Sequence, residues 1–143
     1  ISKQALVLAT RNVALNGDPE RHTTMAIDAF IGMQQLIDQG HKFDIVVVDP
    51  PSFAKMAADI PQALNSYKRL AHLAIQLVAS YGLCVMASCS SRVDQDTFFD
   101  LIESAFDQAD RSYRLIEKTY HDTDHPILFA EGRYLKCGYY KIV

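Results

Sequence analysis

Residues 43–53 read FDIVVVDPPSF, an apolar run that stops abruptly at an acid, two prolines and an aromatic residue. Its central apolar residues are β-branched, which is typical of a strand buried on both faces of a sheet. Neither Pro50 nor Pro51 donates a ladder hydrogen bond, and Pro50 disfavours helical angles at Asp49, so the strand should end there. Open α/β sheets bind ligands at such carboxyl ends of strands. A stiff exit with a solvated acid fits the same pattern.

The bulk composition indicates one globular domain. The chain has 143 residues, of which 49% are hydrophobic and 22% charged, with a formal net charge of -3. An acidic balance argues against a domain that grips nucleic acid by charge alone. The three cysteines, an odd number without framework spacing, indicate free thiols in a reducing compartment. No apolar run approaches membrane-spanning length. We therefore expect a cytoplasmic protein with no membrane partner.

The amino-terminal part predicts two helices around a short strand. Ser2 can cap a helix that Asn16-Gly17 ends. Residues 22–27 predict a short strand, and a second helical pattern runs from Asp28 to Gly40. Asp28 is either the cap of that helix or a ligand contact, and the pattern leaves both open.

The remainder alternates between helices and strands. The predicted elements are a helix from near Pro61, a strand 83–87 ending in Ser88-Cys89-Ser90-Ser91, a helix capped by Ser91 or Asp94, and strands 113–120 and 133–143. Such alternation predicts an α/β fold with a mainly parallel sheet and helices on both faces. The last two strands are joined without a crossover helix, so they should pair antiparallel as a hairpin.

Several short motifs occur together in this order. They are Asp49-Pro50-Pro51-Ser52-Phe53, Tyr67-Lys68, Ser88-Cys89-Ser90, Asp124-His125-Pro126 and Glu131-Gly132-Arg133-Tyr134-Leu135-Lys136. This combination resembles the class I S-adenosylmethionine-dependent methyltransferases that make 5-methylcytosine in bacterial large-subunit ribosomal RNA. The resemblance implies a Rossmann-like sheet, S-adenosylmethionine as cofactor and RNA as substrate.

The resemblance also implies that part of the domain lies outside this chain. Members of the family have a first strand with a Gly-rich loop and a second strand ending in an acid, and neither motif occurs here. We therefore expect residues 1–143 to be a partial methyltransferase domain, inactive alone. The strand 43–48 would then present an unpaired apolar edge, which the fragment would hide by self-association or with its amino-terminal segment.

Carbon 5 of cytosine is a poor nucleophile, and a thiolate adding to carbon 6 activates the ring. The resemblance implies that Cys89, just past a strand end, supplies this thiolate. From the sequence alone, a small buried hydrophobe is the alternative for Cys89, and it is the reading for Cys84 and Cys137. The resemblance places Asp49 at the polar edge of cytosine as a general acid, which requires a raised pKa.

The resemblance assigns further contacts along the same edge. The implied cofactor-binding residues are Asp28, Ala29, Asp49 and Pro50, and the implied substrate-binding residues are Pro51, Phe53, Tyr67 and Lys68. Phe53 would stack on the base, a contact worth roughly 1 to 3 kcal/mol, or it anchors the turn as a core aromatic. Tyr67 and Lys68, with Arg69, would contact RNA phosphate or form a solvated helix face.

Three other readings stay open. The same fold with an Asp-Pro-Pro turn serves methylation of an exocyclic amine, which needs no thiolate. A non-catalytic interaction module would keep the sheet without the cofactor loop. A zinc site is a third use of His121 and His125, although no paired cysteines accompany their spacing.

Overall fold

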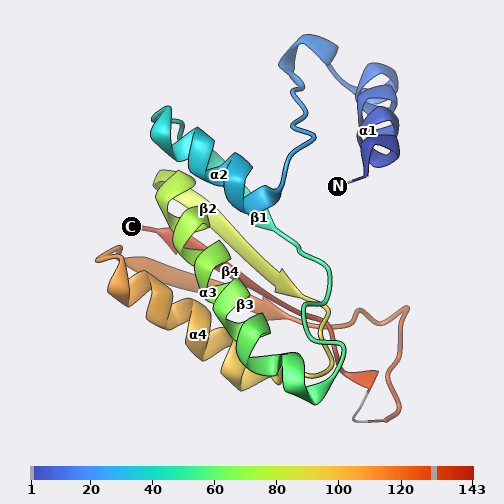
Figure 1. The fold of residues 1–143 in the computed structure, drawn as a ribbon, viewed down its shortest axis with the longest axis vertical. Helices are drawn as coiled ribbons and strands as arrows, with labels where there is room; N and C mark the ends of the chain where they lie inside the picture. The colour runs from blue at the N-terminus through green and yellow to red at the C-terminus, as the bar shows by residue number, and fades with distance from the viewer. Residues whose placement is uncertain (1, 130–131) are drawn as a thin grey trace.

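The computed structural model describes residues 2–129 and 132–143 as a sheet with a layer of helices (Figure 1). Its helices and strands in chain order are α1 (Lys3–Asn16), η1 (Pro19–Arg21), α2 (Ala29–Asp38), β1 (Phe43–Val48), η2 (Ala57–Asp59), α3 (Ile60–Leu77), β2 (Val78–Ser88), α4 (Gln95–Gln108), β3 (Tyr113–Thr119) and β4 (Lys136–Ile142). The strands form one sheet in the order β1-β2-β4-β3. The predicted α/β fold class is confirmed.

The pairing of the strands follows the prediction from the connections. β1 and β2 are parallel, with α3 as the crossover between them. β3 and β4 pair antiparallel, and β4 also pairs antiparallel with β2. The carboxyl-terminal hairpin is therefore confirmed, with β4 inside the sheet and β3 at its edge.

The helices α2, α3 and α4 lie together on one face of the sheet (Figure 1). The main hydrophobic core lies between them and the sheet. It includes Tyr67, Ala71 and Ala74 of α3 and Phe98 and Ile102 of α4, all fully buried. Within residues 2–129 and 132–143 no helix is packed on the opposite face. The prediction of helices on both faces therefore holds for one face only.

Side-chain caps start the helices where the sequence predicted. Ser2 accepts a hydrogen bond from the Ala5 amide, and Asp94 accepts one from the Thr97 amide at 2.8 Å. Gly40 follows α2 with φ of +76°, a left-handed angle that favours glycine. The boundaries of these helices thus follow from local sequence.

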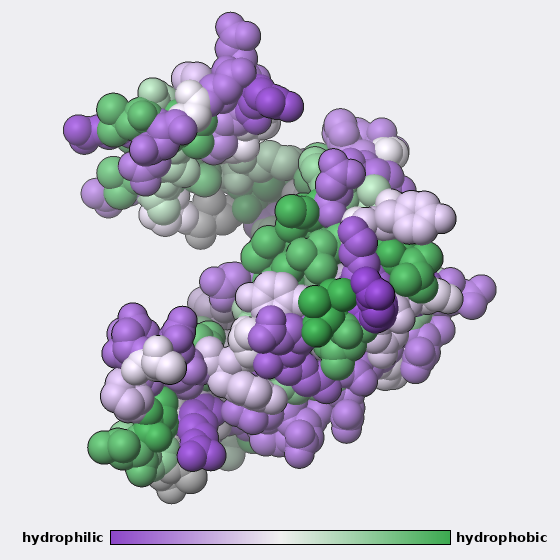
Figure 2. Space-filling view, turned by 180° about the vertical axis from the view of Figure 1, so that it is seen from behind, coloured by the Kyte–Doolittle hydropathy of each residue, from purple (hydrophilic) through white to green (hydrophobic). Residues whose placement is uncertain are grey.

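Burial of β1 on both faces was predicted and is wrong for this structure. Val48 is buried on the helical side, whereas Ile45 and Val47 point to the other side and are 62% and 64% exposed. The cause is that β1 is an edge strand with one covered face. Figure 2 shows hydrophobic residues gathered over the middle of the molecule when it is seen from behind.

The amino-terminal segment differs from its prediction. Residues 22–27 form no strand, because a strand needs a pairing partner and none of the described strands lies beside them. The helix α1 stands apart from α2, α3 and α4 (Figure 1) and has no buried residue. It therefore leaves the edge strand β1 exposed, and the predicted covering by this segment is not seen.

β2 begins earlier than predicted, at Val78 instead of residue 83. Tyr81 has φ of +62°, and the register between β1 and β2 shifts between Phe43 and Ile45. A Cβ on Gly82 would lie 2.9 Å from the Ala79 and Asp44 carbonyl oxygens. Gly82 therefore permits a close backbone approach inside one irregular strand.

None of the helices in the described ranges combines the length and the apolar character needed to cross a membrane.

Candidate active site at the strand ends

The parallel pairing of β1 and β2 brings their carboxyl ends to one edge of the sheet. Val48 is paired with Met86, so the Asp49 turn and the Ser88–Ser90 turn leave neighbouring strands at the same level. Lys136 at the start of β4 is paired with Ser88. The two predicted catalytic residues therefore follow adjacent strands.

Cys89 is the partly exposed residue of a turn that is otherwise buried. Ser88 and Ser90 are both fully buried, whereas Cys89 keeps intermediate exposure. The Ser90 amide donates to Ser88 Oγ at 3.2 Å, which closes the turn on itself. Cys89 thus stays partly exposed between two buried neighbours.

The other two cysteines differ from Cys89 in their surroundings. Cys84 is wholly buried in β2, and burial raises its pKa to about 12. Cys137 is partly buried in β4, and burial raises its pKa also. A thiol whose pKa is raised is a poor source of thiolate near neutral pH. These surroundings fit the prediction that Cys84 and Cys137 are structural.

Tyr67 does not occupy the position predicted for a substrate contact. Its side chain is fully buried, and its hydroxyl forms a hydrogen bond of 2.8 Å with Ser88 Oγ, in which either oxygen can donate. Burial raises the pKa of Tyr67, against the effect of this hydrogen bond, and negative charge at Cys89 and Asp49 raises it further. Tyr67 therefore supports the Cys89 turn from the core, through Ser88.

A hollow of about 740 Å³ lies beside the end of β1. Six of the predicted site residues line it: Asp28, Ala29, Asp49, Pro50, Pro51 and Phe53. Residues of α1 lie along its far wall. Cys89, Tyr67 and Lys68 are not among the lining residues. The hollow thus joins the predicted cofactor residues to the Asp-Pro-Pro turn but not to the cysteine.

Asp28 is the cap of α2, one of the two readings that the sequence left open. Its Oδ1 accepts hydrogen bonds from the Phe30 and Ile31 amides at 2.9 and 3.4 Å. Because both bonds use Oδ1, the cap and a ligand contact through Oδ2 are compatible. Ala29 is the first residue of α2 and is exposed beside it.

Phe53 packs against Tyr67, and Lys68 follows Tyr67 in α3. The Phe53 ring packs edge-on against the Tyr67 ring, with centroids 5.0 Å apart, and is partly exposed. Phe53 therefore anchors the turn and also lines the hollow. Lys68 is partly exposed on α3. Arg69 lies over the Phe30 ring at 4.6 Å, which ties α3 to α2.

Lys136 is a site residue for which the sequence predicted no role. It is 1% exposed, and its Nζ donates to the Ser90 carbonyl at 2.7 Å and to the Tyr134 carbonyl at 3.1 Å. Burial lowers its pKa to about 8, against the opposing effect of negative charge at Asp94 and Cys89. The motif that contains Lys136 was the available signal, but Glu131 of the same motif lies outside the described residues.

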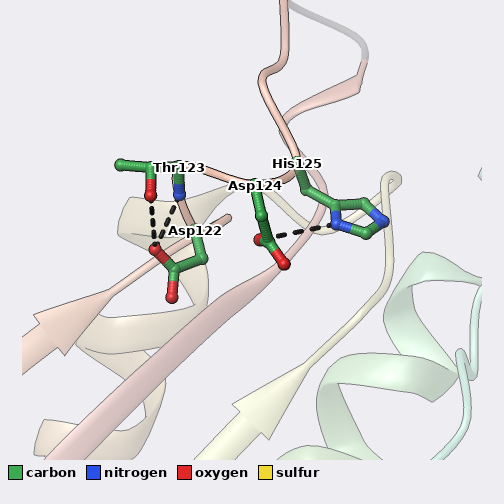
Figure 3. A network of polar contacts seen from close by, with 4 residues as sticks. All are labelled: Asp122, Thr123, Asp124 and His125. Carbon is green, nitrogen blue, oxygen red and sulfur yellow. Dashed lines mark hydrogen bonds and ion pairs between the residues drawn. The ribbon is translucent and has the colours of Figure 1, made fainter.

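The loop with the two histidines forms no metal centre in the described part of the chain. Figure 3 shows Asp122 accepting from Thr123, and Asp124 beside His125. His125 Nδ1 lies 3.6 Å from Asp124 Oδ1, and both side chains are largely exposed. His121 packs against the Tyr134 ring instead. No group of three or more potential metal ligands is found among residues 2–129 and 132–143, so the zinc alternative receives no support.

Comparison with known proteins places this chain beside ribosomal RNA methyltransferases. It is 37% identical over 138 residues to ribosomal RNA large subunit methyltransferase I of Klebsiella pneumoniae, covering 94% of this chain. It is also 37% identical over 139 residues to the protein of the same name from Shewanella amazonensis. The predicted resemblance is confirmed. The chain spans about a third of the length of these relatives, 34% and 35%. No family model matches it.

Solved structures support the same fold. The structure of SMU.776, described as a candidate methyltransferase and complexed with SAH, superimposes with a TM-score of 0.81 over 98% of this chain and 37% of its own, at 19% identity. A candidate SAM-dependent methyltransferase from Streptococcus mutans gives a TM-score of 0.77 over 98% of this chain and 36% of its own, also at 19% identity. At this level of identity the likeness establishes the fold alone.

Proposed function

We propose that this chain is part of an S-adenosylmethionine-dependent methyltransferase that methylates carbon 5 of a cytosine in ribosomal RNA. The observation that carries the proposal is the pairing of β1 with β2, which sets the Asp49 turn beside the turn that exposes Cys89. The names of the relatives support ribosomal RNA as the substrate. Residues 1–143 would form part of one methyltransferase domain.

In this mechanism Cys89 acts first. Its thiolate adds to carbon 6 of the cytosine, a carbon–sulfur bond forms, and the ring becomes nucleophilic at carbon 5. Asp49 donates a proton to ring nitrogen 3 as the thiolate adds, which stabilises the developing negative charge. Carbon 5 would then bond to the methyl group supplied by S-adenosylmethionine, whose methyl–sulfur bond breaks. Loss of the carbon 5 proton to Asp49 or to water eliminates the Cys89 thiolate, and nitrogen 3 returns its proton to solvent. Pro51 holds the turn rigid, and Phe53 stacks on the base.

The hollow beside β1 fits a nucleoside cofactor in size and chemistry. Its volume of about 740 Å³ lies in the range of small-molecule sites. Asp28 and Ala29 at the start of α2, together with Asp49 and Pro50, would hold S-adenosylmethionine there. When bound, the cofactor supplies an electrophilic methyl group. Lys68 on α3 would contact RNA phosphate.

The test is a Cys89→Ser substitution in the full-length protein, with ribosomal RNA as substrate and nucleoside mass spectrometry as the readout. We expect 5-methylcytosine formation to be lost, because a serine hydroxyl is far less nucleophilic than a thiolate. Cys137→Ser is the matched control and should keep the activity. Full activity of the Cys89→Ser protein would overturn the proposed role of the thiol.

Methylation of an exocyclic amine is a second candidate, and the lining of the hollow favours it. Asp49, Pro51 and Phe53 line the hollow, but Cys89 does not. An Asp-Pro-Pro turn with an aromatic neighbour suffices for an amine substrate. In that case Cys89→Ser would leave methylation intact, and the product would carry its methyl group on nitrogen.

Cofactor binding distinguishes a methyltransferase from the remaining alternative, a non-catalytic interaction module. Isothermal titration calorimetry with S-adenosylmethionine should detect binding by a version extended upstream, and weak or absent binding by residues 1–143. No binding by the extended version would favour the interaction module.

We also propose that residues 1–143 self-associate through the exposed edge of β1 in a cytoplasmic setting. Ile45 and Val47 are apolar and more than half exposed along a strand edge, the combination that promotes edge-to-edge pairing. Val47→Lys should shift sedimentation toward the monomer. Tyr81→Lys, which changes an exposed residue of β2 instead of β1, should not. A monomeric wild-type chain at high concentration would contradict this proposal.

A further inference from the structure

The ammonium group of Lys136 is bonded to the turn that carries Cys89. Lys136 is paired with Ser88 across β2 and β4. Its Nζ lies 5.9 Å from the ring centroid of Phe98 in α4, so the side chain is on the helical face of the sheet. Its Nζ donates to the Ser90 carbonyl at 2.7 Å. Since Ser90 follows Cys89, this bond fixes the exit of the turn.

Tyr67 and Lys136 thus hold the two serines that flank Cys89. The Tyr67 hydroxyl is bonded to Ser88 Oγ, and the Lys136 ammonium is bonded to the Ser90 carbonyl. All four of these residues are at most 1% exposed. The backbone of Cys89 is therefore held on both sides by residues anchored in the core.

The two anchors differ in charge. Tyr67 is a neutral phenol, whereas Lys136 carries a proton that its burial makes costly to retain. The electrostatic interaction of Lys136 with Cys89 favours the protonated amine when the sulfur is negative. Asp94 at the start of α4 is the carboxylate that also acts on Lys136.

We propose that Lys136 is a positioning residue for the reaction of Cys89: its buried ammonium fixes the Ser90 carbonyl and places a positive charge at the turn that carries Cys89. This inference rests on the proposed function only for its use in methyl transfer. The charge effect itself is a property of the free protein.

The charge effect separates from a purely mechanical role through two alkylating reagents. Iodoacetate carries a negative charge and iodoacetamide is neutral, and both react with thiolates. A buried cation next to the sulfur accelerates the anionic reagent more than the neutral one. Loosening of the turn alone would change both rates in the same proportion. The ratio of the two rates therefore reports the charge.

The experiment measures the alkylation of Cys89 at neutral pH by peptide mapping of residues 1–143. Lys136→Gln keeps a hydrogen-bond donor and removes the charge, and Lys136→Arg keeps the charge. We expect the rate ratio to fall roughly fivefold in Lys136→Gln and to stay near the wild-type value in Lys136→Arg. Lys141→Gln, in the same strand, is the matched control, and Cys137 is an internal reference in every sample.

An unchanged ratio of the two alkylation rates in a folded Lys136→Gln protein, including the case in which both rates change by the same factor, would overturn the proposal. Circular dichroism checks folding, and Lys136→Met is the second neutral variant if the glutamine variant does not fold. Because no RNA or cofactor is used, a charge effect at Cys89 without methyl transfer would refute the proposed function but keep the role of Lys136. Methyl transfer that survives Lys136→Gln at the wild-type rate would refute the role of Lys136 and leave the proposed function standing.

Discussion

Replacing Lys136 by methionine should change how the stability of the protein depends on pH. The side chain is 1% exposed, and burial lowers its pKa from 10.5 to about 8. One pKa unit corresponds to about 1.4 kcal/mol, so holding the charge inside the folded protein costs roughly 3 kcal/mol. Methionine is of similar length and carries no proton, so it removes this cost together with its pH dependence.

The sign of the effect follows from proton binding. Below about pH 8 both the folded and the unfolded protein carry the Lys136 charge, and the full cost is present. Between about pH 8 and pH 10.5 the folded protein releases a proton that the unfolded chain keeps. The free energy of unfolding of the wild type therefore rises across this window relative to that of Lys136→Met, by roughly 3 kcal/mol at most.

Urea denaturation of both proteins at several pH values between neutrality and pH 10.5 measures this difference. Cys84 and Tyr140, whose pKa values burial raises, make both proteins less stable at high pH, and their effect cancels in the difference. The offset at neutral pH is not diagnostic, because methionine also leaves the Ser90 carbonyl without its donor. Parallel pH profiles for the two proteins would refute the argument, and Lys141→Met should give such parallel profiles.

Three further substitutions test local features. Asp28→Ala removes the cap of α2 and should cost about 1 kcal/mol of stability in urea denaturation, whereas Asp28→Asn should keep most of it. Gly82→Ala places a Cβ 2.9 Å from the Asp44 carbonyl oxygen and should lower the free energy of unfolding by more than about 1 kcal/mol; a neutral effect would show that β2 can shift. Tyr67→Phe removes the hydrogen bond to Ser88 and should cost about 1 kcal/mol with an unchanged denaturant slope, and an unchanged midpoint would show that this bond contributes nothing.

Elements with local causes could be predicted from the sequence. The caps at Ser2, Asp28 and Asp94 each depend on one side chain and on amides within three residues. The end of β1 at Asp49 depends on the two prolines that follow it. The antiparallel hairpin depends on the absence of a crossover helix between its strands. Each of these features is written in a short stretch of sequence and is present in the structure.

Features that depend on distant neighbours could not be predicted in the same way. Residues 22–27 have the composition of a strand, but a strand exists only when another strand pairs with it. The apolar residues of β1 predict burial, but Ile45 and Val47 are exposed because nothing in the described ranges covers that face. Both errors have one physical cause, since both elements lie where the sheet has no further described neighbour.

The site shows the same division between local and distant causes. The motif around Cys89 predicts a turn at a strand end, and that turn is present. Its support comes from Tyr67, whose bond to Ser88 spans 21 residues, and from Lys136, whose bond to Ser90 spans 46 residues. A resemblance in sequence identifies both the residues that contact substrate and the residues that hold them in place. It does not distinguish one group from the other. Burial makes the distinction: Cys89 is accessible, and Tyr67 and Lys136 are not. The chemistry proposed for the thiol therefore depends on two side chains that no RNA would touch.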